Sequence, residues 1–254
     1  MLLNTILLLA LMGPHPNQDP SAKKLIEKML VRYYTAKSMT GTIKLTVASE
    51  GASASLMTTL QFEKESKLYI YQQKLSANPD PGQPTKWLVT SDGNMFSYNV
   101  PNEKFEAAPG LRLVEPVHNA RVGINLDYRA IYTAASKSLG DRSMPLDIAI
   151  AQKSDLEYRR NQWASYVVEG QKEVGGKSCY VVSGNFRFYL GAEPVGKFQM
   201  LITDEGDLVQ YVEEQNIAIG PERGARVVKV TNQWDVSLTV NGKVDPALFK
   251  VVLR

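Results

Sequence analysis

Residues 41–49 read Gly41-Thr-Ile-Lys-Leu-Thr-Val-Ala-Ser49, and this stretch decides the fold class of the 254-residue chain. Its Ile, Leu and Val side chains alternate with Thr and Lys, a period of two that is typical of a half-buried β-strand. Glu50-Gly51 then makes a turn, and residues 53–63 return with the same alternation. The pattern predicts an antiparallel hairpin.

Further runs of the same kind follow this hairpin, and short Gly-containing connections such as Ser91-Asp-Gly-Asn94 join them. Successive hairpins predict an antiparallel meander. A sheet of ten or more strands has to curl, because its strands twist. The fold class is therefore mainly β (α+β), a curved antiparallel sheet or unclosed β-barrel of about 11 strands. The further predicted strands cover residues 67–75, 86–90, 95–100, 163–173, 177–184, 185–190, 196–203, 208–216 and 225–240.

Helical patterns occur at two places. Asp19 and Pro20 are suited to begin a helix whose apolar residues recur at helical spacing as far as Tyr33. The middle of the chain contains an irregular segment over residues 101–125, followed by three short helices. We expect these helices, with the N-terminal one, to cover the apolar face of the sheet. The three central helices are predicted at residues 127–138, 145–152 and 155–161.

The N-terminal apolar run, residues 1–12, is too short to span a bilayer and has the length of a signal-peptide core. We interpret residues 1–18 as a signal peptide and residues 19–254 as a single domain. A buried N-terminal strand or helix is the alternative. Export places the protein in the periplasm or another extracytoplasmic space, with no stable transmembrane span after signal removal.

Composition and titratable residues argue against several function classes. The net charge is +3 with scattered basic residues, which argues against nucleic-acid binding. We expect the single cysteine, Cys179, to be a buried residue of a strand. His15 and His118 have no ligand partners at metal-site spacing, and Glu213 and Glu214 should point to opposite faces of a strand. We therefore expect no enzyme activity, no metal and no cofactor.

Aromatic residues along the predicted strands are more informative about function than the titratable residues. They form either an ordinary core or the wall of an apolar groove for an acyl chain, and both uses require the same residue types. The candidate ligand-binding residues are Phe62, Tyr69, Tyr71, Trp87, Phe96, Tyr98, Phe186, Phe188, Phe198 and Trp234.

Several segments together resemble a known family. They are the helix near Ala22, the hairpin Thr90-Ser-Asp-Gly-Asn-Met-Phe-Ser-Tyr98, the strand Gly175-Gly-Lys-Ser-Cys-Tyr-Val-Val182 and the ending Val244-Asp-Pro-Ala-Leu-Phe249. The chain resembles the outer-membrane lipoprotein-sorting (LolA/LolB-like) proteins over residues 20–254. The resemblance implies an unclosed β-barrel with a helical lid over a hydrophobic cavity. It assigns no residue here to the lid-contacting arginine of the carriers.

We therefore expect an exported cell-envelope protein that binds a lipid or lipoprotein acyl chain in an apolar groove, as a carrier or lipoprotein-sorting factor. Apolar burial of about 0.8 kcal/mol per methylene would drive binding. The alternative is an envelope sensor or protein-interaction module that carries no lipid.

Overall fold

The computed structural model describes residues 20–75, 85–99, 112–119, 123–219 and 226–251. The predicted signal peptide, the Asp19 cap and His15 lie outside these ranges. Among the described helices, none is both long and apolar enough to cross a membrane.

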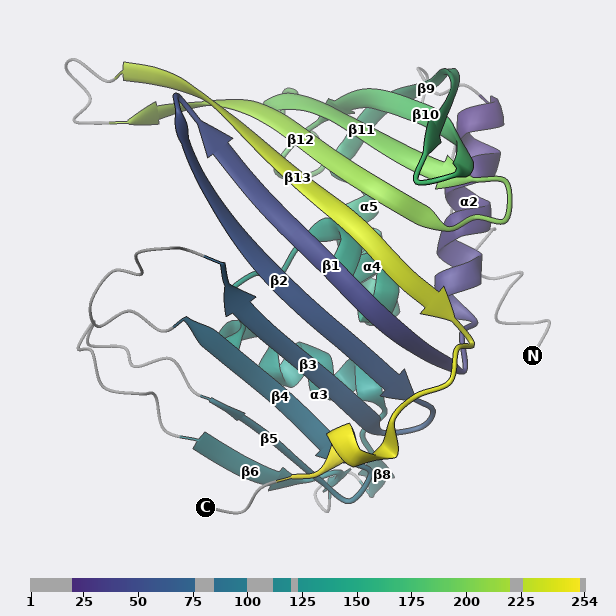
Figure 1. Ribbon diagram of the computed structural model, residues 1–254, viewed down its shortest axis with the longest axis vertical. Helices are drawn as coiled ribbons and strands as arrows, with labels where there is room; N and C mark the ends of the chain where they lie inside the picture. Colours follow the sequence, from purple (N-terminus) through teal and green to yellow (C-terminus); the bar gives the residue numbers. More distant parts are fainter. Residues whose placement is uncertain (1–19, 76–84, 100–111, 120–122, 220–225, 252–254) are drawn as a thin grey trace.

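One eleven-stranded antiparallel sheet dominates the fold, in the spatial order β6-β5-β4-β3-β2-β1-β13-β12-β11-β10-β9 (Figure 1). β1 pairs with β2 on one side and with β13 on the other, so strands from the two ends of the chain meet at the centre. The edge strands β6 and β9 do not pair with each other, which confirms the prediction of an unclosed sheet. The strands are β1 (Ser38–Ser49), β2 (Ala52–Glu63), β3 (Lys67–Lys74), β4 (Lys86–Asp92), β5 (Met95–Asn99), β6 (Arg112–Pro116), β9 (Trp163–Val174), β10 (Lys177–Phe186), β11 (Gly196–Thr203), β12 (Leu208–Ile219) and β13 (Arg226–Val240).

The central helices lie together on one face of this sheet, and α2 (Pro20–Tyr34) lies beside the end formed by β9 to β11 (Figure 1). We call the face under the central helices the inner face. The short helix η2 (Pro246–Phe249) packs on the outer face, where the Asp245 backbone N–H donates to the Gln61 side chain. The central helices are α3 (Tyr128–Ala135), η1 (Ser136–Ser138), α4 (Met144–Ile150) and α5 (Lys153–Arg160).

Local sequence explains where these helices begin. The Asp127 carboxylate accepts a hydrogen bond from the Ala130 backbone N–H at 2.8 Å and so caps α3. Pro145 occupies the first turn of α4, where its missing N–H costs no hydrogen bond. All seven residues of α4 are buried, so this helix fills the space between α2 and the sheet.

Two predicted boundaries are wrong. The expected strand at residues 185–190 is absent, because β10 ends at Phe186 and residues 187–195 connect it to β11. The segment 101–125, expected to be irregular, contains β6 and the two-residue strands β7 (His118–Asn119) and β8 (Ile124–Asn125). β6 forms because the free edge of β5 offers backbone hydrogen bonds to a segment without strong alternation of its own.

Gly41 lets the two central strands approach closely. Its φ of +146° belongs to a region that favours glycine, and a Cβ there would overlap the carbonyl oxygen of Ser237 on β13. The close pairing of β1 with β13 therefore depends on this residue lacking a side chain.

Candidate functional site

Aromatic rings line the inner face of the sheet. Four of them form a continuous row across β9, β11, β12 and β13, with successive ring centroids 6.0, 6.2 and 5.6 Å apart. We call this set, Trp163, Phe198, Tyr211 and Trp234, the aromatic row. On the other half of the sheet, Phe62 stacks on Tyr128 of α3 at 4.1 Å. The inner face thus presents an apolar surface that extends over most of the sheet.

Five of the ten candidate aromatics are buried in the hydrophobic core, each no more than 5% exposed. Trp87 and Tyr98 are half-buried, and Trp87 lies opposite Gln72 on the inner face. The five buried residues are Phe62, Phe96, Phe186, Phe198 and Trp234.

Three candidates do not line the inner face, and their placement there is wrong. Tyr69 and Tyr71 alternate with the buried Leu68 and Ile70 along β3, so their side chains point to the outer face. Phe188 follows the end of β10, and its side chain is 54% exposed.

Residues 128–160 form one unit over the inner face, which we call the lid. At its centre, the Asp147 side chain has no exposed surface and bonds to two guanidinium groups. Arg159 Nε donates to Oδ2 at 2.6 Å, and Arg142 Nε donates to Oδ1 at 3.1 Å. The Tyr132 hydroxyl donates to Oδ1 at 2.6 Å. This buried network ties α3, α4 and α5 into one body.

The lid is fastened to the sheet by a second polar cluster, which we call the latch. Gln72 of β3, itself fully buried, accepts hydrogen bonds from the backbone N–H groups of Gly140 and Asp141 at 2.8 and 3.1 Å. Its Nε2 donates to the Asp141 carbonyl at 2.8 Å. From β13, Trp234 Nε1 donates to the Asp141 carboxylate at 3.2 Å. The latch therefore consists of Gln72, Trp234, Gly140 and Asp141.

Burial changes the acidity of the groups near the lid. Desolvation raises the pKa of Asp141 and of Glu213, although hydrogen bonds from Trp234 and from Tyr211, respectively, oppose the shift. The Tyr211 hydroxyl donates to Glu213 Oε1 at 2.9 Å and accepts from Trp163 Nε1 at 3.2 Å. Two carboxyl groups near the aromatic row therefore hold a proton more tightly than they would in water.

Arg129 joins the lid to the N-terminal helix. Its guanidinium lies 4.5 Å from the Tyr34 ring centroid and 4.7 Å from that of Tyr128. It donates to the carbonyls of Tyr34 and Ala151 at 2.8 and 3.2 Å. The sequence offers no local signal for this contact, because the partners lie far apart along the chain.

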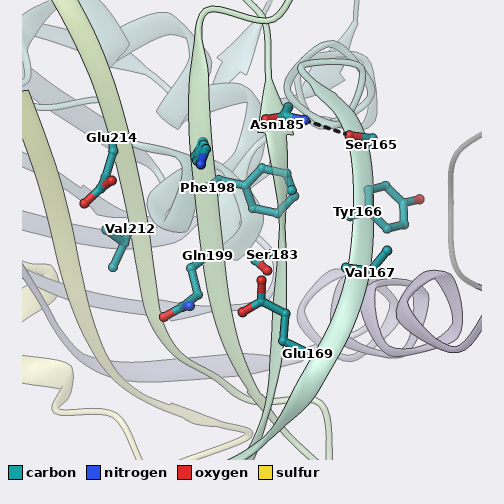
Figure 2. A pocket seen from close by; sticks show the side chains of 12 residues that line it. Ser165, Tyr166, Val167, Glu169, Ser183, Asn185, Phe198, Gln199, Val212 and Glu214 are labelled. Carbon is teal, nitrogen blue, oxygen red and sulfur yellow. Dashed lines mark hydrogen bonds between the residues drawn. The ribbon is translucent and has the colours of Figure 1, made fainter.

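The outer face carries a separate groove of about 620 Å³ over β9 to β12 (Figure 2). Its lining mixes polar and apolar side chains, and one of its contacts is the hydrogen bond from Asn185 Nδ2 to Ser165 Oγ at 3.2 Å. Phe198 of the aromatic row also borders this groove. The side chains labelled in Figure 2 include Ser165, Val167, Ser183, Asn185, Gln199, Val212 and Glu214.

The described residues considered above for catalysis or metal binding lie on separate strands or on opposite faces of one strand. His118 Nδ1 lies 3.0 Å from the side-chain oxygen of Asn125, and Cys179 is buried. Glu214 forms an ion pair with Lys229 at 3.0 Å on the outer face, whereas Glu213 lies on the inner face. In these ranges, no group of three or more His, Cys, Asp or Glu side chains is placed to hold a metal ion.

No protein-family model matches the chain, and no curated protein matches it significantly. Solved structures with a similar fold include the lipoprotein LppX of Mycobacterium tuberculosis, 11% identical with a TM-score of 0.40, over 89% of this chain and 98% of that one. The MucA/MucB complex of Pseudomonas aeruginosa is 10% identical with a TM-score of 0.42, over 91% of this chain and 61% of that one. A LolA superfamily protein from Nitrosomonas europaea is 10% identical with a TM-score of 0.29, over 91% and 97%. Similarity at this level says nothing about function.

Proposed function

We propose that this chain, with its LolA/LolB-like arrangement of an unclosed sheet under a helical lid, binds the acyl chain of a lipid or lipoprotein between the two. It acts as a carrier or sorting factor in the periplasm or another extracytoplasmic space and leaves its cargo chemically unchanged. One observation carries this proposal. The apolar inner face is covered by short helices that are tied to one another by buried charges and to the sheet by the latch.

An acyl chain would replace the apolar side chains of α4 against the aromatic row. α4 contributes Met144, Leu146, Ile148 and Ile150 to the buried core. Each methylene removed from water contributes about 0.8 kcal/mol, so a dozen contribute about 10 kcal/mol. Each latch hydrogen bond contributes only about 1 kcal/mol net. The acyl chain therefore offsets the loss of the latch hydrogen bonds, and the displaced side chains of α4 have to stay out of water by packing against it.

Release of the lid as one unit would keep its ionic network intact. Asp147 stays paired with Arg142 and Arg159 if α3, α4 and α5 move together. Breaking that network would instead leave buried charges without partners, at a cost of about 3–5 kcal/mol. Release of the lid would break the latch, the stacking of Phe62 on Tyr128 and the hydrogen bond from Arg129 to Tyr34. Gln72 makes three of the latch hydrogen bonds, so we place control of access at this residue.

The experiment compares two neighbouring glutamines on opposite faces of β3. Gln72→Leu removes the side chain that bonds to the lid backbone, and Gln73→Leu changes the outer face, where Gln73 bonds to Tyr71 at 3.2 Å. Delipidated full-length protein is mixed with a fluorescent fatty acid, and uptake is followed by fluorescence and native mass spectrometry. We expect uptake by wild type and Gln73→Leu, and faster uptake by Gln72→Leu.

Failure of all three proteins to take up the probe would overturn the proposal. If pull-down from envelope extracts also recovers a protein partner without lipid, the chain is a sensor or interaction module instead.

A further inference from the structure

The connection between β10 and β11 exposes three consecutive apolar side chains. Phe188, Tyr189 and Leu190, which we call the tip, are 54%, 62% and 59% exposed. Tyr158 of α5, 55% exposed, lies beside them, and its hydroxyl donates to the Phe188 carbonyl at 3.3 Å. Single exposed apolar residues are common, but a contiguous group of this size usually marks a contact surface.

The tip is held in place by hydrogen bonds, so its exposure is a feature of the fold. The Phe188 carbonyl also accepts from Gln162 Nε2 at 3.0 Å. Arg187 is fixed by two bonds, from its backbone N–H to Gln162 O at 2.8 Å and from Nε to Asn161 O at 3.0 Å. At the other end, the Ala192 N–H donates to Tyr189 O at 3.1 Å. The backbone is satisfied locally while the apolar side chains point away from the core.

Basic residues adjoin the tip. Arg187 precedes Phe188, Arg160 ends α5 next to Asn161 and Gln162, which bond to Arg187 and Phe188, and Lys197 is the second residue of β11. Glu193 is the acidic residue within the connection, and Glu157 of α5 is paired with Lys153 at 3.7 Å. Aromatic and aliphatic side chains next to Arg and Lys are the combination that binds the interface of an anionic bilayer.

We propose that the tip is a docking site for an anionic lipid bilayer. Phe188 and Leu190 enter the acyl region, Tyr189 and Tyr158 lie at headgroup level, and the basic residues contact lipid phosphates. A lipid surface fits better than a protein pocket, because the exposed apolar side chains are adjoined by Arg187 and by the basic end of α5. This inference holds whatever cargo the inner face binds.

The test compares binding of full-length protein to vesicles of phosphatidylglycerol and phosphatidylethanolamine with binding to phosphatidylcholine vesicles. The triple variant Phe188→Ser, Tyr189→Ser, Leu190→Ser should bind anionic vesicles about tenfold or more weakly than wild type, because three apolar side chains are lost. The control variant, Leu75→Ser, Ile124→Ser, Val227→Ser, removes three exposed apolar residues elsewhere and should bind as wild type does. The N-terminal apolar run is present in all three proteins, so it cannot cause a difference.

A second readout locates the contact. Cys179 is buried and is the chain's only cysteine, so an environment-sensitive fluorophore can be attached selectively to Leu190→Cys or Val227→Cys. Brightening at residue 190 and not at residue 227 on anionic vesicles is the expected result. Equal vesicle binding by wild type and the tip variant, or brightening at both positions or neither, would overturn the proposal. So would capture of an envelope protein through the tip without vesicle binding.

Discussion

Asp147 holds the lid together at the scale of a single residue. Its fully buried carboxylate accepts from Arg142, Arg159 and Tyr132. Asp147→Ala leaves two guanidinium groups without this partner, and because both are partly exposed we expect a loss near the lower end of the usual range, about 3 kcal/mol in the free energy of unfolding. Urea unfolding measures the loss.

The control for this prediction is Asp155→Ala. The side chain of Asp155 is more exposed than that of Asp147. It forms an ion pair with Arg142 and not with Arg159. It should cost less than about 1 kcal/mol. Equal losses in the two variants would contradict a central role for Asp147.

Glu213 gives the lid region a pH dependence whose sign follows from its pKa. Burial raises this pKa above the ordinary 4.5, so the folded state binds the proton more tightly than the unfolded chain does. The resulting stabilisation is present below pH 4.5 and is lost as the pH rises through the folded-state pKa. Glu213→Gln keeps the acceptor for Tyr211 and should reduce the loss of stability between about pH 4.5 and 8.

Glu214→Gln is the matched control, since it removes the neighbouring carboxylate from the outer face. Unfolding free energies of the three proteins across this pH range test the prediction. The same change of slope in both variants would mean that the inner-face position of Glu213 is irrelevant.

The alternation along β3 indicates which of its side chains face the core. Alternation along β3 groups Leu68, Ile70 and Gln72 on the inner face, so the outward direction of Tyr69 and Tyr71 could be predicted. That Gln72 bonds to the lid could not, because its partners at residues 140 and 141 are brought close only by the folded chain. The role of Asp147 could not be predicted for a similar reason. A single acidic residue in an apolar helix does not indicate that Arg142 and Arg159 will pair with it.

At the scale of elements, the loop that joins η1 to α4 lies directly against the sheet at Gly140. A Cβ at this position would lie 2.8 Å from atoms of the Trp87 ring. Gly140→Ala should therefore lift the loop, cost about 1–3 kcal/mol in the free energy of unfolding and speed acyl-probe uptake.

A double-mutant cycle separates this clash from other effects of the substitution. In a Trp87→Leu background the ring is absent, so Gly140→Ala should cost markedly less. An unchanged cost in that background would show that the contact with Trp87 does not hold the loop.

Element boundaries were least predictable where the chain leaves the sheet. Residues 185–190 contain alternating aromatics, yet the strand stops at Phe186 because Arg187 and Phe188 bond to Asn161, Gln162 and Tyr158 instead of to a neighbouring strand. The periodicity of the sequence does not show whether backbone groups will bond to a neighbouring strand or to another part of the fold. The starts of α3 and α4, in contrast, lie within one residue of those predicted, whereas α5 begins at Lys153, two residues before its predicted start, without a side-chain cap.

For the whole molecule, strand number and antiparallel pairing followed from hairpin spacing, and strand twist implied a curled sheet. The open edge was implied by the family resemblance. The pairing of β1 with β13 required the fold, because it joins segments almost 200 residues apart. The inner face can be both a core and a cargo surface, since the lid covers it with side chains of the same kind that an acyl chain would replace.

Photo-crosslinking tests that dual role most directly. A fatty acid with a diazirine near its terminal methyl is bound to delipidated protein, irradiated, and its attachment sites are mapped by mass spectrometry of peptides. The expected labels fall on the inner face and the lid, at residues such as Phe62, Trp234 and Ile148, and they disappear when unlabelled fatty acid competes. Labels confined to the outer groove at Val167 and Val212, or labelling that competition does not reduce, would contradict an acyl-binding site beneath the lid.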